Sequence, residues 1–558
     1  MAFIEIENLR YRYPSSEHFA LDGISLQIEK GSFLGIIGRN GAGKSTLASA
    51  IAGLVPQFYK GAYGGRVLVD SLDASRTPVS TLSSKVGLVF QNPFNQLSGA
   101  ADNVYDEICF GMQNFAIDRD EMIRRADQVL SLMGMTEYKD RNPFDLSGGQ
   151  MQRVALSSVL VMEPDVIILD EPTSQLDPQG SEEVFQAVDK LRERGITVIM
   201  IEQKIDKIAK YSDHILLLEN GKTIGYGTPE ELFANYDTTR YGVLPPAVVQ
   251  IADALSFRKS NETLPVLEQD AIPLMSEHII FTEARHTREE ATDAIMRAEN
   301  LSFHYNEGKD VLSSISLSFD SRPTAIIGQN GAGKTTLAKL LKGLLKPSEG
   351  RIFFKDIDTK NRTAASIAPD IGYVFQNPDD QIFKPKVLDE VMFGPLNIGM
   401  GEAKAKEQAM KALEMVRLET TLERNPYDLD LHERKMVALA SVIAMSPSVI
   451  IFDEPTIAQD DDGKQMMRDV IAELAKEGKL VISILHDMDL VASSFDRVIA
   501  MAHGTVIDDG APEEVFSHSE TLKRAGLEEP HVSSLARKLG SNDTILTVAE
   551  FLSLARKV

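Results

Sequence analysis

The stretch GRNGAGKST at residues 38–46 decides the fold, and it is repeated as GQNGAGKTT at residues 328–336. An apolar run precedes each copy, at residues 33–37 and 324–327, as expected for a strand that leads through a loop into a helix. In such a loop the glycines let backbone N–H groups converge on a phosphate, the lysine reaches the terminal phosphates and the next hydroxyl reaches Mg²⁺. The sequence therefore predicts two phosphate-binding loops.

Three further segments repeat in the same order, so the chain consists of two homologous halves. They are VFQNP at residues 89–93 and 374–378, RNPxDL at 141–146 and 424–429, and DEPT at 170–173 and 453–456. Within each half, continuous apolar runs alternate with helical patterns, which predicts an α/β fold with a mainly parallel sheet core. The helical pattern before each DEPT segment predicts an inserted helical subdomain.

A pattern that starts at Gly242 recurs from Gly526, so each half is expected to end in a small helical appendage. The segment from Glu262 to Thr292 is predicted to be the connection, because it is polar and only weakly periodic. We expect four parts: a first α/β unit at 1–235, its appendage and linker at 236–292, a second α/β unit at 293–518, and a C-terminal appendage at 519–558.

Paired carboxylates follow an apolar strand in each half. Asp170 and Asp453 end the strand, where a carboxylate can hold the shell of a Mg²⁺ ion. Glu171 and Glu454 come one residue later, where a base could polarise an attacking water. Acids after strands can also merely cap the next turn, but the proline and threonine that follow in both copies favour the catalytic interpretation.

SGGQ at residues 147–150 is predicted to begin a helix, with Ser147 as the N-cap and Gln150 completing a capping box. Gly148 and Gly149 leave backbone donors open, so the same element can present N–H groups and a hydroxyl to an anion.

The chain has 558 residues, a formal net charge of −24 and a single cysteine, Cys109. This charge disfavours a nucleic-acid binder, because affinity for a duplex depends on cations that neutralise phosphates. One cysteine cannot form an intramolecular disulfide. The longest apolar stretch, residues 437–452, is interrupted at 446–448 and falls short of the roughly 18 residues that cross a bilayer. We therefore expect any membrane role to depend on partner proteins.

Together these segments resemble a tandem ATP-binding cassette (ABC) ATPase over nearly the whole chain. The resemblance implies that the halves pair head to tail and hold each ATP between the phosphate loop of one half and the SGGQ signature of the other, with Asp177 and Asp460 in the loops that cross between them. It implies that Tyr13 and Tyr305 stack on adenine, although an exposed strand aromatic is the alternative.

The resemblance also implies which residues bind the nucleotide and the metal ion. The implied nucleotide-binding residues are Tyr13, Gly38, Asn40, Gly41, Gly43, Lys44, Ser45, Thr46, Gln91, Ser147, Gly148, Gly149, Gln150, Tyr305, Gly328, Asn330, Gly331, Gly333, Lys334, Thr335, Thr336 and Gln376. The implied Mg²⁺ ligands are Ser45, Gln91, Asp170, Thr335, Gln376 and Asp453.

NPDDQIF at residues 377–383, followed by VMFGxxN at 391–397, more specifically resembles the ATPases of energy-coupling factor (ECF) importers of vitamins and metal ions. This implies a peripheral protein at the cytoplasmic face of the cell membrane, bound to a transmembrane coupling protein and a substrate-binding membrane protein. A thiamine precursor is one substrate that fused ATPases of this kind suggest. The alternatives are a monosaccharide importer and a soluble ABC protein that acts on ribosomes or DNA; the acid-rich linker disfavours the latter.

Acids lie beside both glutamine segments, and we expect them to attract a basic helix of the membrane subunit, although each alone could be solvated surface. They are Asp106, Glu107, Asp379, Asp380, Asp389 and Glu390.

The two halves depart from the family pattern at two places. DLHE at residues 430–433 replaces SGGQ; Asp430 can still cap the helix but should repel a γ-phosphate. Gln203 stands where the second half has His486, the expected γ-phosphate contact. Head-to-tail pairing puts both departures in the site of Glu171 and leaves the site of Glu454 complete. We therefore predict one site, with Glu454 and His486 as catalytic residues, that hydrolyses ATP, and one, with Glu171, that mainly binds nucleotide.

Overall fold

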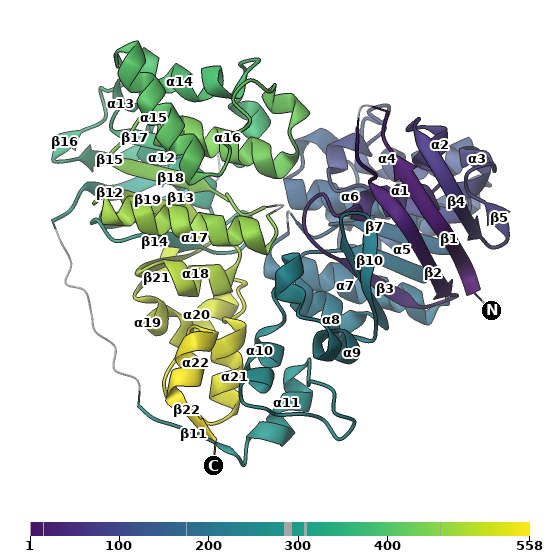
Figure 1. Ribbon diagram of the computed structural model, residues 1–558. Coiled ribbons are helices and arrows are strands. Elements are labelled where there is room, and N and C mark those ends of the chain that lie inside the picture. Colours follow the sequence, from purple (N-terminus) through teal and green to yellow (C-terminus); the bar gives the residue numbers. More distant parts are fainter. Residues whose placement is uncertain are drawn as a thin grey trace. The chain divides into compact units, whose positions relative to one another are not determined.

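Each half of the chain forms its own unit around a six-stranded, mainly parallel sheet (Figure 1). The computed structural model describes residues 2–14, 16–174, 176–283, 293–305, 310–457 and 459–557. It divides into Met1–Glu277 and His278–Val558. Within the described residues, no helix combines the length and the apolar character that a bilayer span requires.

The central sheet of the first unit has the strand order β10-β9-β3-β8-β7-β6. Every neighbouring pair is parallel except β9 and β10. Strands β3 and β8 are buried along their whole length, as expected for a parallel sheet with both faces covered. The strands are β3 (Phe33–Ile37), β6 (Val86–Val89), β7 (Val166–Asp170), β8 (Thr197–Ile201), β9 (His214–Glu219) and β10 (Lys222–Gly227).

The second unit repeats this topology with the order β17-β18-β19-β14-β20-β21. The apolar runs predicted as buried strands in both halves are strands in the structure, which confirms the two α/β units. The strands are β14 (Thr324–Ile327), β17 (Ile371–Val374), β18 (Val449–Asp453), β19 (Leu480–Ile484), β20 (Arg497–Ala502) and β21 (Thr505–Gly510).

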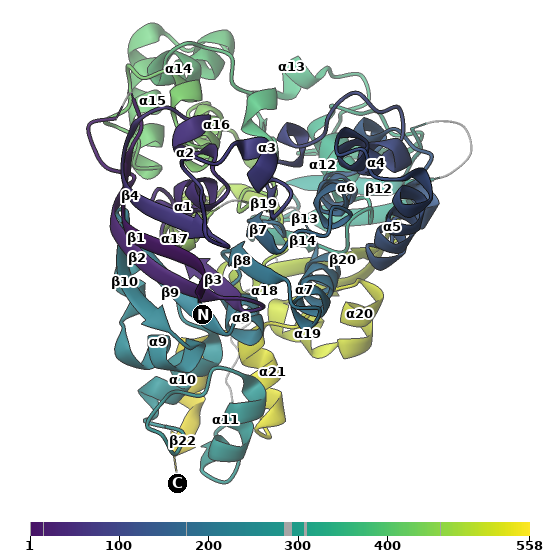
Figure 2. The same ribbon diagram turned by 90° about the vertical axis from the view of Figure 1, so that its right-hand side faces the viewer.

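A four-stranded antiparallel sheet packs beside the phosphate-loop helix of each unit, and Figure 2 shows β1, β2 and β4 side by side. Its buried residues share a core with helix α1 (Lys44–Ile51) in the first unit and helix α12 (Lys334–Lys342) in the second. The strands are β1 (Ala2–Arg12), β2 (Leu21–Glu29), β4 (Ala62–Val69) and β5 (Leu72–Asp73), then β12 (Met296–Phe303), β13 (Leu312–Phe319), β15 (Glu349–Phe354) and β16 (Ile357–Asp358). Short helices near this sheet are α2 (Leu54–Gln57), α3 (Val79–Leu82) and α13 (Ala364–Ile367).

The predicted helical subdomain is present in both units, and in the second unit it lies at one end, above the sheet in Figure 1. Further helices follow the strands that end in Asp170 and Asp453. The subdomain helices are α4 (Val104–Asn114), α5 (Arg119–Leu132) and α6 (Gly148–Leu160), then α14 (Val387–Asn397), α15 (Glu402–Met415) and α16 (Leu431–Ile443). The later helices are α7 (Pro178–Glu193) and α8 (Ile205–Tyr211), then α17 (Asp461–Lys476) and α18 (Met488–Ser494).

The appendages consist of short helices, and the connection is more regular than its weak periodicity predicts. Its described part contains helix α11 and strand β11, and β11 pairs antiparallel with β22 at the far end of the chain. A partner this distant in sequence leaves no local pattern, so the strand could not be predicted. The elements are α9 (Pro229–Asn235), α10 (Ala247–Ala254), α11 (Glu268–Met275) and β11 (Ile279–Phe281), then α19 (Pro512–Ser517), α20 (Ser519–Arg524), α21 (His531–Lys538), α22 (Val548–Leu554) and β22 (Ala555–Lys557).

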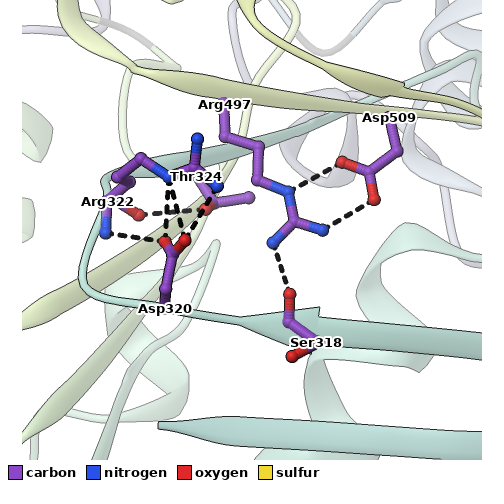
Figure 3. A network of polar contacts seen from close by, with 6 residues as sticks. All are labelled: Ser318, Asp320, Arg322, Thr324, Arg497 and Asp509. Carbon is purple, nitrogen blue, oxygen red and sulfur yellow. Dashed lines mark hydrogen bonds and ion pairs between the residues drawn. The ribbon is translucent and has the colours of Figure 1, made fainter. Parts of the chain in front are cut away.

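The antiparallel edge of each central sheet is fastened differently. In the second unit, Arg497 on β20 binds both carboxylate oxygens of Asp509 on β21, at 2.7 and 2.6 Å, and donates to the carbonyl of Ser318 (Figure 3). In the first unit, the matching positions hold His214 and Tyr226, whose rings stack with centroids 5.2 Å apart. The same topology is therefore stabilised by an ion pair in one unit and by ring stacking in the other.

Candidate nucleotide-binding and hydrolysis sites

The lysine of each phosphate loop lies over its own loop. Nζ of Lys44 donates to the carbonyl oxygens of residues 38 and 39 at 2.7 and 2.8 Å. Nζ of Lys334 does the same in the second unit, at 2.8 and 3.0 Å. Gly38 and Gly328 let each loop pack against the neighbouring strand, because a Cβ at either position would overlap a carbonyl oxygen of that strand. A buried ammonium group thus lies where a phosphate chain would bind each loop.

The two tyrosines expected to stack on adenine lie directly beside these loops. The hydroxyl of Tyr13 is 3.2 Å from Oγ1 of Thr46, and that of Tyr305 is 3.2 Å from Oγ1 of Thr336. Tyr305 remains 58% exposed, so its ring is open to a ligand.

In the second unit, four strand ends bring the predicted catalytic residues together. Asp453 at the end of β18 accepts hydrogen bonds from Oγ1 of Thr335 at 3.0 Å and from the hydroxyl of Tyr373 at 2.6 Å. Glu454 accepts a bond from Nε2 of Gln376 at 2.7 Å and lies 3.0 Å from Nε2 of His486. One carboxylate thus faces the phosphate loop, and the next faces the glutamine and the histidine.

The first unit assembles the same constellation with different partners. Glu171 accepts hydrogen bonds from Nε2 of Gln91 at 2.6 Å and from Nε2 of Gln203 at 2.8 Å. Gln203 also reaches Oδ1 of Asn40 at 3.3 Å, and the side chain of Ser45 bonds to Asp170. Two amides therefore surround Glu171, whereas Glu454 has one amide and one imidazole.

The two glutamates differ in charge environment. Burial raises the pKa of Glu171 to about 7, and the negative charges of Glu202 and Asp170 add to this rise. Burial also acts to raise the pKa of Glu454, but the charge and hydrogen bond of His486, with smaller effects of the lysines, outweigh it and hold this pKa below its usual value. Glu454 therefore stays ionised more readily than Glu171.

Glu202 is a buried acid near Glu171 that the sequence analysis did not select as a candidate site residue. It is 3% exposed and accepts a bond from the hydroxyl of Thr173 at 2.6 Å, in the turn that follows Glu171. The second unit has the apolar Leu485 at this position. The available signal was an acid directly after a buried strand, next to the unusual Gln203.

Both predicted capping boxes are present at the signature helices. Ser147 and Gln150 cap α6 reciprocally, and Asp430 and Glu433 cap α16 in the same way. Gly148 and Gly149 form the first turn of α6 without side chains. Downstream, Asp177 and Asp460 are N-caps as well, accepting bonds from backbone N–H groups at the start of α7 and α17.

Of the six acids expected to attract a basic helix, four are exposed and two are not; the exposed ones are Asp106, Asp379, Asp380 and Asp389. Glu107 and Glu390 are buried in the fold. Glu107 accepts bonds from the backbone N–H and the hydroxyl of Ser98, and Glu390 accepts bonds from the backbone N–H groups of Phe383 and Lys384. Asp379 is paired with Arg434 at 3.0 Å. Burial forces Glu107 and Glu390 to find partners within the fold, so these two charges stabilise the loop itself.

Exposed aromatic side chains lie in the same region of each unit as these acids. In the second unit, the rings of Phe383 and Phe393 meet edge to face, and the ammonium group of Lys384 lies over both. In the first unit, Phe94 and Phe144 are neighbours with centroids 6.4 Å apart. All four phenylalanines are exposed. Neighbouring exposed aromatics are characteristic of protein contact surfaces.

Comparison with known proteins agrees with this geometry. Residues 21–174 and 312–457 match a protein-family model described as ABC transporter. The chain is 37% identical over 576 residues to an ABC transporter ATP-binding protein of Methanosarcina mazei, covering 100% of this chain and 97% of that protein. It is 36% identical over 568 residues to one of Caldanaerobacter subterraneus, covering 99% of both.

Among solved structures, cbiO1 from Clostridium perfringens, part of the ABC transporter complex cbiONQ, is 34% identical; the match covers 44% of this chain and 100% of that chain, with a TM-score of 0.39. The ATP-binding cassette MJ0796, solved as a dimer with ADP and Pi, is 27% identical; the match covers 40% of this chain and 98% of that chain, with a TM-score of 0.37.

Proposed function

This chain belongs to the ABC transporter family as a tandem of two ATP-binding cassettes with ATPase activity, and from that premise we propose that it energises an importer of the energy-coupling factor type. The cargo in this proposal is a vitamin, a vitamin precursor such as that of thiamine, or a metal ion. ABC transporter ATP-binding proteins work with membrane components. Here we propose a transmembrane coupling protein and a substrate-binding membrane protein, with this chain peripheral at the cytoplasmic face.

The segments that resemble this importer class support the proposal by their place in the fold. Gln381 accepts a bond from the backbone N–H of Phe375 and donates to the carbonyl of Ala438 on α16. Gln96 makes the matching bonds in the first unit. In each unit these bonds therefore connect the residue before Gln376 or Gln91 to the signature helix, next to the exposed aromatic residues. A membrane subunit docked on those aromatics would contact the loop that carries Gln376.

Mg²⁺ fits the oxygen atoms at both carboxylate sites. A hydroxyl and a carboxylate lie together in each unit, Ser45 with Asp170 and Thr335 with Asp453, and hard oxygen ligands of this kind suit Mg²⁺. Bound Mg²⁺ would neutralise charge that develops on the phosphates. The amide nitrogens of Gln91 and Gln376 donate to Glu171 and Glu454, and we propose that their amide oxygens bind the same ion.

We propose that the two sites are unequal and that the second unit carries most of the hydrolysis. The observation that carries this proposal is the pairing of Glu454 with His486, against Glu171 with Gln203 and the buried Glu202. Glu454 would accept a proton from the attacking water while His486 orients it and contacts the γ-phosphate. Head-to-tail pairing, also proposed here, would place Asp430 against the nucleotide of the first unit and weaken that site further.

Matched substitutions of the two glutamates test this proposal. Glu454→Gln should reduce steady-state ATP turnover by about two to four orders of magnitude, the usual contribution of a general base. Glu171→Gln, which alters the same atoms in the first unit, should leave a substantial fraction of turnover. Equal losses in the two variants would refute unequal sites.

A further inference from the structure

The altered signature helix of the second unit contacts the turn that follows the catalytic glutamate. Nδ1 of His432 on α16 lies against Oε1 of Gln459, and Nζ of Lys435, one turn further, donates to the carbonyl oxygen of Ile457 at 2.9 Å. Gln459 and Lys435 are both buried. Gly463 makes room for the first contact, because a Cβ there would overlap Oε1 of Gln459. We call His432 and Lys435 the signature strap.

The turn that the strap contacts holds Glu454 in an unusual conformation. The φ angle is +51° at Glu454 and +47° at Glu171, so both units use the left-handed region that residues other than glycine rarely adopt, and within the described chain only the second unit adds the strap. Such a conformation persists only where the surrounding structure determines it. The backbone N–H of Ile457 donates to the carbonyl of Glu454, and Lys435 binds the carbonyl of the same Ile457. Two hydrogen bonds thus lead from the signature helix to the backbone of the catalytic residue.

Among the described residues of the first unit, no equivalent strap is present. Gly149 occupies the position of His432, and Gln152 occupies that of Lys435, as the repeated RNPxDL segment aligns them. Gln152 is buried, and within the described chain neither polar atom of its amide has a hydrogen-bond partner. The turn after Glu171 instead receives a bond from Lys204, whose Nζ donates to the carbonyl of Thr173 at 3.2 Å.

We propose that His432 and Lys435 are positioning residues for ATP hydrolysis in the second unit, because they hold the turn that presents Glu454. The second unit has side chains where the first has the glycines of its signature. These side chains make the helix start a poor anion site, and in this proposal His432 supports the neighbouring catalytic turn instead. This inference rests on the proposed function, in which Glu454 is the main catalytic base.

A double-mutant cycle in the full-length protein tests the first contact. His432→Ala and Gln459→Ala should each lower kcat for ATP about tenfold, because a small displacement of a catalytic group slows the reaction without weakening binding. KM should change by less than about twofold. The double variant should be no slower than either single variant, since both remove one contact. An unchanged kcat in either single variant, or losses that multiply in the double variant, would overturn the proposal.

Lys435 provides an independent test, with rescue by a conservative change. Lys435→Gln, which installs the residue of the first unit, should lower kcat to a similar degree, and Lys435→Arg, which keeps a donor and a charge, should restore most of it. The matched control Gln152→Met removes the amide without a partner in the first unit and should leave turnover unchanged. Equal rates for the Gln and Arg variants at unchanged melting temperature would refute the role of Lys435.

The outcomes also separate this inference from the function on which it rests. If Glu454→Gln abolishes turnover while the strap variants remain fully active, only the positioning role of His432 and Lys435 is refuted. If Glu454→Gln itself retains turnover, the proposed catalytic role of the second unit fails.

Discussion

Lys342, at the end of the phosphate-loop helix α12, should make the stability of the protein depend on pH in the alkaline range. Its side chain is buried, and Nζ donates to the carbonyl of Ile371 at 2.7 Å and to that of Ala364 at 3.4 Å. Burial lowers the pKa of Lys342 from 10.5 to about 8. The first unit has Ala52 at this position, so this buried charge is particular to the second unit.

The sign of the effect follows from proton binding. Below pH 8 the lysine is protonated in both states, and the folded protein bears the whole cost of a buried charge, about 3 kcal/mol at 1.36 kcal/mol for each unit of pKa. Between the folded and unfolded pKa values the unfolded chain binds more protons, so the free energy of unfolding rises with pH. From pH 7 to pH 9.5 this rise should be about 2 kcal/mol for Lys342 alone.

Lys342→Met removes the charge and should remove this rise. At pH 7 the gain from losing a buried charge is offset by the two carbonyl groups left without a donor, each costing about 1 to 3 kcal/mol. The pH dependence is therefore the diagnostic quantity. Urea denaturation followed by circular dichroism at pH 7 and 9.5 measures it, with the exposed Lys346→Met as the control for a lost surface charge. If the difference in the free energy of unfolding between Lys342→Met and wild type is the same at both pH values, the lowered pKa assigned to Lys342 is refuted.

Two further predictions concern the nucleotide sites and the membrane partner. The site of Lys44 should retain Mg-ATP through several turnovers of the other site; release of all radiolabelled nucleotide at the turnover rate during a chase would contradict this. Replacing Phe383 and Phe393 together by serine should abolish copurification with the membrane subunit but leave ATP hydrolysis of the isolated chain intact. Ile357→Ser, elsewhere on the second unit and at a residue as exposed as Phe383, should copurify normally. If the phenylalanine variant also copurifies normally, the docking surface lies elsewhere.

Features that depend on residues close together in the sequence could be predicted. The phosphate loops require glycines, a lysine and a hydroxyl within nine positions, and the capping boxes at Ser147 and Asp430 require partners three residues apart. Buried parallel strands show as continuous apolar runs, because both faces of the sheet are covered. Because the sequence repeats, each strand or motif predicted in one half could also be predicted at the matching position of the other half. These signals predicted the fold, which the structure confirms, and they yielded the residues proposed for the two nucleotide sites.

The environment of those residues was decided only by the tertiary structure. The high pKa of Glu171 depends on burial and on Glu202, which lies 31 positions away in sequence but joins the same turn through Thr173. The pairing of β11 with β22, the burial of the acids near the glutamine loops and the contact of His432 with Gln459 likewise join distant segments. A hydrogen bond or a Coulomb interaction depends on distance in space and on exclusion of water, and neither quantity is encoded in the spacing of residues along the chain.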